Sequence, residues 1–126
     1  MGVPQDRKYL ESHEWCFVDG SVVTIGITQF AADQLSDVTY VELPAAGAEL
    51  TAGKIFGEIE SVKATSEMYC AVSGKVVEVN AALEDQPELV NTDPFGEGWM
   101  IKVEASDLAD VEKLLSAAEY DKKYTE

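Results

Sequence analysis

The sequence has few residues of the kinds that bind metals. It contains one histidine, His13, and two cysteines, Cys16 and Cys70, which lie far apart and form no C-x-x-C pair. A zinc site needs a cluster of Cys and His ligands, so we expect no metal site. Each cysteine fits a small buried hydrophobic residue in a strand, although a disulfide between the two stays open.

Long hydrophobic runs are also missing. The longest apolar runs contain only a few residues, which excludes a membrane span. Residues 1–8 lack the apolar core of a signal peptide and the Arg/Ser-rich character of a transit peptide. We therefore expect a soluble protein, located in the cytoplasm if the source is bacterial, or in the mitochondrial matrix if the source is eukaryotic and the chain is processed.

Basic residues are scarce. Only 9 Lys and Arg residues oppose 24 Asp and Glu residues, and the net charge is −15. Nucleic-acid phosphates and anionic membrane surfaces repel such a chain, so we expect neither nucleic acid nor a membrane as a partner. The charge favours partner proteins with basic patches, although a need for solubility alone would also explain it.

What is present is an ordinary globular composition. The chain has 126 residues, of which 46% are hydrophobic and 26% are charged. This length can bury one modest hydrophobic core, and no linker or low-complexity tract divides it. We expect a single domain over residues 1–126.

Short apolar segments separated by Gly and Pro turns predict a mainly β fold. Asp19-Gly20 favours a tight hairpin between strands at 14–18 and 22–27. Thr28 can cap a short helix that continues to about Leu35, with Ala31 and Leu35 on one face. Further strands are predicted at 38–43, 75–79 and 99–103, which together indicate an antiparallel sandwich or barrel.

The second half of the chain adds loops and helices. The passage 80–98 is rich in Pro and Gly and is expected to be a loop that Leu83, Leu89 and Val90 hold against the core. Asp107 can cap an amphipathic helix, and Ser116 with Glu119 matches a capping box for a second short helix. The apolar face of the first helix would hold Leu108, Val111, Leu114 and Leu115.

Residues 55–70 predict two strands that form a hairpin with Lys63 at the turn. The alternation of residue types before and after the turn has a period of two, as in a strand with two distinct faces. Carboxylates stand on both sides of Lys63. An ordinary solvated lysine explains this pattern, and so does a lysine that is displayed for modification by another enzyme.

A direct search for catalytic motifs finds none. The sequence has no G-x-S-x-G nucleophile elbow, no phosphate-binding G-x-x-x-x-G-K and no G-x-G-x-x-G. We therefore expect no catalytic residues and no enzymatic activity. A displayed lysine on a small β scaffold instead suits a carrier, because its amine can form an amide with a long cofactor while paired strands fix the attachment point.

An ordered series of segments resembles the glycine cleavage system H protein family over nearly the whole chain. The most specific are Glu60-Ser61-Val62-Lys63-Ala64-Thr65-Ser66 and the segment 72–80. The other matching segments, in the same order as in the family, are Lys8-Tyr9, 12–15 (Ser-His-Glu-Trp), 23–28, 40–44, 88–91 and 98–102.

The resemblance implies a hybrid barrel-sandwich of two antiparallel sheets, with a short internal helix and C-terminal helices. It also implies lipoic acid linked through an amide to Lys63. Lipoate-attaching enzymes that act on such domains look for a Glu three residues before the lysine and a Gly eleven residues after it, which are Glu60 and Gly74 here. Gly47 matches a further recurrent glycine. Turn geometry alone would also explain both glycines.

The resemblance further implies three catalytic partners: glycine decarboxylase, aminomethyltransferase and dihydrolipoamide dehydrogenase. The lipoyl arm would carry an aminomethyl group from the first enzyme to the second, and the third would reoxidise it. Between the enzymes the loaded arm would rest in a cleft on the carrier. By resemblance, Ser12, Glu14 and Glu67 form this cleft, where a carboxylate would attract the cationic amine.

The chain departs from the family at two places. Some relatives have a histidine at the position of Gln34, and Cys70-Ala71 replaces a pair that often contains proline. Four alternatives stay open: a lipoyl domain of a 2-oxoacid dehydrogenase, a biotin carrier, a relay that donates lipoate to other enzymes, and an unmodified acidic interaction module. The Ser-His-Glu-Trp segment and the C-terminal helices disfavour the first two.

Overall fold

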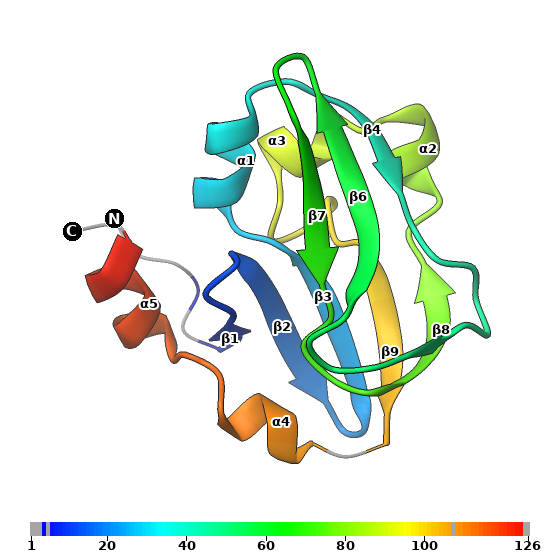
Figure 1. The fold of residues 1–126 in the computed structure, drawn as a ribbon, viewed down its shortest axis with the longest axis vertical. Helices are drawn as coiled ribbons and strands as arrows, with labels where there is room; N and C mark the ends of the chain where they lie inside the picture. Colours follow the sequence, from blue (N-terminus) through cyan, green and yellow to red (C-terminus); the bar gives the residue numbers. More distant parts are fainter. Residues whose placement is uncertain (1–3, 5, 107, 125–126) are drawn as a thin grey trace.

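The computed structural model describes residues 4, 6–106 and 108–124. This part of the chain forms two antiparallel sheets and several short helices (Figure 1). The predicted mainly β fold is therefore confirmed. The strands are β1 (Lys8–Tyr9), β2 (Glu14–Asp19), β3 (Val22–Ile27), β4 (Val38–Glu42), β5 (Glu49–Leu50), β6 (Ile55–Ser61), β7 (Thr65–Tyr69), β8 (Gly74–Val79) and β9 (Ile101–Ala105).

The larger sheet has six strands in the order β1-β2-β3-β9-β8-β5, and the smaller has three in the order β4-β6-β7. The two sheets enclose one apolar cluster, to which β2, β3, β6 and β9 all contribute side chains. A single-residue shift in register would turn these side chains to the solvent, so their burial fixes the pairing of the strands.

The hairpin at Asp19-Gly20 forms as predicted, and Gly20 takes a positive φ of 67°. The predicted strand bounds are close to those observed. The strand predicted at 38–43 ends at Glu42, and the last strand begins at Ile101 rather than Trp99. Such differences of one or two residues are usual at strand ends.

The strict alternation predicted before Lys63 is wrong at its start. Ile55 is 47% exposed, whereas Phe56 is buried. The register between β6 and β7 shifts between Ile55 and Gly57, so Phe56 is the extra residue of a β-bulge. Gly57 lies so close to the Glu42 carbonyl that a Cβ would meet this oxygen at 2.2 Å. The bulge and the close approach turn Phe56 toward the core.

The predicted helix after Thr28 is confirmed as α1 (Gln29–Leu35). The Thr28 side chain accepts a hydrogen bond from the Ala31 N–H at 3.3 Å, so Thr28 caps the helix. The face prediction needs correction, because Ala32, not Ala31, is buried with Leu35 in the core. Ala31 lies at the edge of this face and is half-buried.

The passage 80–98 is not entirely loop. It contains two single-turn helices, α2 (Ala82–Asp85) and α3 (Leu89–Thr92). Leu83 and Val90 are buried, and Leu89 packs against the core, as predicted. Helices of one turn have too little sequence for a periodic pattern to develop, so they were not visible in the sequence.

The C-terminal segment has two helices, α4 (Ala109–Glu112) and α5 (Ala117–Tyr124). The predicted first helix is only one turn long, and its predicted cap, Asp107, lies outside the described residues. The predicted capping box is confirmed, because the Ser116 N–H donates to the Glu119 carboxylate at 2.9 Å and the Glu119 N–H donates to the Ser116 hydroxyl at 3.2 Å.

A second, smaller core holds α5 against the first strand. Tyr9, Trp15, Ala117 and Tyr120 are buried together, and the rings of Tyr9 and Tyr120 stack with centroids 5.0 Å apart. Figure 1 shows α5 beside β1, outside the two sheets. No helix in the described part of the chain is long and apolar enough to cross a membrane.

Candidate functional site

Lys63 lies at the tip of the β6–β7 hairpin, as predicted. In Figure 1 this tip is the point of the hairpin farthest from the β7–β8 connection. The Lys63 side chain is exposed and makes no hydrogen bond or ion pair with any residue that the structure describes. Its neighbour Val62 is 66% exposed, although it is apolar. The amine is therefore accessible to another protein.

Ser61 shapes the tip, and the sequence reasoning did not identify it. Its hydroxyl accepts hydrogen bonds from the N–H groups of Lys63 and Ala64 at 3.3 and 3.1 Å and donates to the Ala64 carbonyl at 3.0 Å. These three bonds use the whole capacity of one hydroxyl group. A serine at the first position of a turn is the sequence signal that could have revealed this role.

Two further hydrogen bonds attach the tip to β4 and to the residue just before β4. The Val62 N–H donates to the Asp37 carbonyl at 3.1 Å, and the Thr39 hydroxyl donates to the Glu60 carbonyl at 3.2 Å. The backbone on both sides of Lys63 is thus held in place. Such a fixed backbone presents the amine in one geometry to a modifying enzyme.

Glu60 lies on the outer face of the three-stranded sheet. It is directly opposite Tyr40 on β4 and Thr65 on β7, and all three residues are exposed. Residues directly opposite each other in a sheet share a face. The Glu60 carboxylate is therefore accessible from the solvent, in the second row of residues from the tip.

Gly47 and Gly74 lie away from the tip, at the β5–β8 end of the molecule. Gly74 pairs with Leu50 and Ala105, and a Cβ at Gly74 would meet the Glu104 carbonyl oxygen at 2.1 Å. Gly47 has a φ of +95°, and its N–H donates to the Val76 carbonyl at 2.7 Å. The close approach of the Glu104 carbonyl thus explains the glycine at position 74, and the positive φ explains the glycine at position 47.

The three residues predicted for the cleft line a single cavity of about 110 Å³. Ser12 comes from the β1–β2 connection and Glu14 is the first residue of β2, whereas Glu67 comes from β7, on the hairpin that carries Lys63. Strand alternation places Glu67 on the outer face beside Glu58, so it forms the rim rather than the floor of this cavity. The rest of the lining is His13, Ile27, Ala31, Gln34, Leu35, Ile59, Ser66 and Met68.

Glu14 is the buried acid of this cavity, with an exposed fraction of 1%. One carboxylate oxygen accepts a hydrogen bond from the Ser12 hydroxyl, and the other accepts from the Tyr69 N–H at 2.7 Å. Burial raises the pKa of Glu14 to about 7, and the hydrogen bonds from Ser12 and Tyr69 oppose this rise. A nearby cation would favour the ionised form and lower this pKa.

Helix α1 forms another wall of the cavity through Ala31, Gln34 and Leu35. Gln34 contributes a neutral amide where a histidine would contribute a charge that depends on pH. His13 is half-buried, and its Nδ1 lies 2.8 Å from the Tyr120 hydroxyl, so the expectation of a hydrogen-bonded histidine is confirmed. Burial lowers the pKa of His13 and favours its neutral form.

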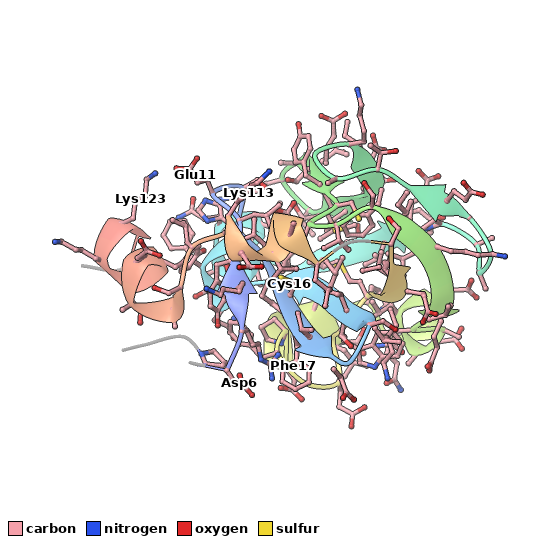
Figure 2. All side chains as sticks on the ribbon, turned by 90° about the horizontal axis from the view of Figure 1, so that it is seen from below. Asp6, Glu11, Cys16, Phe17, Lys113 and Lys123 are labelled. Carbon is pink, nitrogen blue, oxygen red and sulfur yellow. The ribbon has the colours of Figure 1, made fainter. Side chains whose placement is uncertain are left out.

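Cys16 and Cys70 are both buried, and they form no disulfide. Figure 2 shows Cys16 within the body of the molecule. Burial raises the pKa of Cys16 to about 12 and also raises the pKa of Cys70. Both are therefore neutral thiols at neutral pH, as expected of buried hydrophobic residues. In the described part of the chain no group of three or more His, Cys, Asp or Glu residues could hold a metal ion.

The sequence matches the family model described as "Glycine cleavage H-protein" over residues 7–126. A glycine cleavage system H protein from Symbiobacterium thermophilum is 56% identical over 119 residues, which cover 94% of this chain and 93% of that protein. A probable glycine cleavage system H protein from Haloarcula marismortui is 55% identical over 118 residues, which cover 94% of this chain and 93% of that protein.

A solved structure is also similar. The crystal structure of a glycine cleavage system H protein from Mycobacterium marinum superimposes with a TM-score of 0.90 at 38% sequence identity, over 98% of this chain and all of that chain. Both the sequence and the fold thus agree with the resemblance. The chain belongs to the glycine cleavage H-protein family, the lipoyl-carrying and non-catalytic component of the glycine cleavage system.

Proposed function

We propose that lipoic acid is attached through an amide to Lys63, and that the cavity beside Glu14 holds the loaded arm. The observation that carries this proposal is the position of Lys63. It is an exposed amine on a hairpin tip whose backbone is fixed by Ser61. Lipoate would supply a disulfide that opens as it accepts the aminomethyl group and that is left as a dithiol once the group has been passed on.

The distance from Lys63 to the cavity suits such an arm. Glu67 is four residues beyond Lys63 on the same hairpin, which corresponds to about 13 Å at roughly 3.3 Å per residue. A lysine side chain extended by a fatty-acyl chain can cover this distance. The cavity wall next to Glu67 is apolar, since it includes Ile59 and Met68. It therefore fits a hydrocarbon arm that ends in a polar group.

Glu14 would bind the cationic amine at the end of the loaded arm. A charge-assisted hydrogen bond of this kind contributes about 1.5–3 kcal/mol. Ser12 and the Tyr69 N–H orient the carboxylate, and Glu67 adds a second acid at the rim. The amine would lower the raised pKa of Glu14, so that the carboxylate ionises when the arm is bound.

We further propose that residues 1–126 act as one domain. Its partners would be glycine decarboxylase, aminomethyltransferase, dihydrolipoamide dehydrogenase and a lipoate-attaching enzyme. Glu60 is exposed close to Lys63, which supports recognition by the attaching enzyme. Gly47 and Gly74 would contribute by keeping the backbone in place. The location stays as predicted from the sequence, the cytoplasm of a bacterium or the matrix of a mitochondrion.

Reconstitution of the cycle tests the carrier function. The lipoylated chain is added to the decarboxylase, aminomethyltransferase and dehydrogenase without another carrier, and glycine-dependent NADH formation is measured. We expect activity with the unaltered chain and with Lys54→Arg, a control at the exposed lysine just before β6. Activity should be lost in Lys63→Arg. Equal activity of Lys63→Arg would refute the proposal.

The cleft is tested by Glu14→Ala. We expect this variant to accept lipoate normally, because Glu14 is remote from the fixed tip, yet to lose the aminomethyl group to water faster. An unchanged rate of hydrolysis would exclude the role of Glu14. Glu49→Ala, which removes an exposed carboxylate from β5, serves as the control.

A further inference from the structure

We propose that Tyr120 is a positioning residue for the arm cleft, because its hydroxyl joins the two chain segments that form the cleft walls. The inference rests on the proposed function of the cleft. It assigns to the C-terminal helix α5 a role in holding the loaded arm, although no α5 side chain that the structure describes lines the cavity.

Tyr120 is fully buried in the second core, with an exposed fraction of 0%. Its hydroxyl oxygen lies 2.8 Å from His13 Nδ1 and 2.8 Å from the Thr28 hydroxyl oxygen. His13 is one wall residue of the cavity and stands between Ser12 and Glu14. Thr28, which is also fully buried, caps the helix that forms another wall.

The two walls also meet directly at this point. The Thr28 N–H donates to the His13 carbonyl at 2.9 Å, and the Ala32 N–H in α1 donates to the Thr28 carbonyl at 3.0 Å. His13 has a φ of +77°, which is uncommon for a residue other than glycine. Such a backbone persists only where the surroundings hold it, and the bond to Tyr120 is part of what holds it.

The donors and acceptors of Thr28, Tyr120 and His13 allow their hydrogen bonds to run in one direction, from Thr28 through Tyr120 to His13. We assign the Thr28 hydroxyl as donor to Tyr120 and the Tyr120 hydroxyl as donor to His13 Nδ1. Thr28 then still accepts from the Ala31 N–H. This direction requires a neutral His13 with its proton on Nε2, which is the charge state that burial favours.

Helix α5 is itself firmly placed, so Tyr120 can act as a fixed reference for both walls. Leu115 and Tyr9 exchange two backbone hydrogen bonds of 2.9 Å just before the helix. An ion pair between Lys123 and Glu11 joins the far end of the helix to the residue before Ser12. Figure 2 shows these two side chains next to each other, from α5 and from the β1–β2 connection.

The test compares Tyr120→Phe with Tyr9→Phe, first without lipoate. Both changes remove one buried hydroxyl from the same stacked pair, but the Tyr9 hydroxyl donates to the Pro4 carbonyl and does not reach the cleft. Amide hydrogen exchange is measured for every residue. We expect exchange to accelerate about three- to tenfold at Thr28 and Ala32 in Tyr120→Phe only, which is the effect of losing one hydrogen bond.

A merely structural role predicts a different result. General destabilisation would accelerate exchange equally in the core strands, for example at Ile25 and Val103. Either that uniform increase or unchanged exchange at Thr28 and Ala32 would overturn the inference. Because this measurement uses the chain without lipoate, its outcome does not depend on whether Lys63 is modified.

The second measurement uses the lipoylated chain. Loss of the aminomethyl group to water should be faster in Tyr120→Phe than in Tyr9→Phe, with equal lipoylation of both variants. Equal rates of hydrolysis would refute a role of Tyr120 in protecting the arm. Absence of lipoate from Lys63 in all variants would instead refute the proposed function and would leave the exchange result intact.

Discussion

Glu14 is the one carboxylate that is buried among the described residues, and its environment sets its charge. Burial disfavours the ionised form, whereas the hydrogen bonds from Ser12 and Tyr69 favour it. The two effects leave the pKa at about 7, well above that of an exposed glutamate. The cleft can therefore hold either a neutral acid or a carboxylate near neutral pH, and a bound cation selects the carboxylate.

This raised pKa makes stability depend on pH. Between about pH 4.5 and pH 7 the folded chain keeps the Glu14 proton that the unfolded chain has released, so the free energy of unfolding falls as pH rises and becomes constant above pH 7. Glu14→Gln lacks this titration. We expect the free energy of unfolding of the original chain, relative to Glu14→Gln, to decrease between pH 5 and pH 8 in urea titrations. A constant difference would contradict the account.

Ser61 acts on the tip through three hydrogen bonds of one hydroxyl group. In Ser61→Ala the N–H groups of Lys63 and Ala64 lose these partners, so we expect faster amide exchange at both residues and slower lipoylation at an unchanged melting temperature. Thr65→Ala, an exposed hairpin residue, is the control. Equal rates of lipoylation in the two variants would show that the fixed turn is not needed by the attaching enzyme.

At the scale of the elements, the three-stranded sheet carries an unfavourable row of charges. Glu42, Glu58 and Glu67 lie directly opposite one another on its outer face. Like charges in such positions destabilise a sheet by roughly 0.2–1 kcal/mol for each pair. The row includes the rim residue of the cleft.

Replacing the central acid should relieve this repulsion. We expect Glu58→Gln to raise the free energy of unfolding by about 0.5–1 kcal/mol at low salt, and by less at high salt because of screening. Glu49 stands opposite Lys75 instead, so Glu49→Gln should not stabilise the chain. Urea titrations at two salt concentrations check both variants. Destabilisation by Glu58→Gln would contradict the expectation.

Gly74 shows that a residue expected to serve recognition also has a packing role. A methyl group there would collide with the Glu104 carbonyl oxygen, so we expect Gly74→Ala to cost about 1–3 kcal/mol and to lower the melting temperature. Gly20→Asn, at a positive φ in open space, is the control and should cost little. A melting temperature unchanged by Gly74→Ala would show that the strands adjust without cost.

At the scale of the molecule, the sequence was sufficient for the seven longer strands that the structure describes and for the hairpin with Lys63, since period-two patterns and turn residues are local signals. The strands β1 and β5 were not predicted, because two residues are too few for such a pattern. The bulge at Phe56 was not visible, because Ile55 and Phe56 are both apolar and the pattern does not show which one faces the core. The short helices α2 and α3 were also missed, being only one turn long.

The cleft residues were expected only from the resemblance to a family. Ser12 and Glu67 are far apart in the sequence, and only the folded chain brings the β1–β2 connection and the β6–β7 hairpin to one cavity. Tyr120 was even less accessible to prediction, because a buried tyrosine in a terminal helix has the pattern of an ordinary core residue. Its contacts to His13 and Thr28 depend on the folded structure.

Every role proposed for this chain depends on a lipoyl group attached to Lys63. The most direct measurement is the intact mass of the chain after expression with lipoate and an attaching enzyme, followed by mass analysis of the peptide that contains Lys63. We expect a mass increase of one lipoyl group, located on Lys63 and absent from Lys63→Arg. No increase, or an increase located on another lysine, would contradict this expectation.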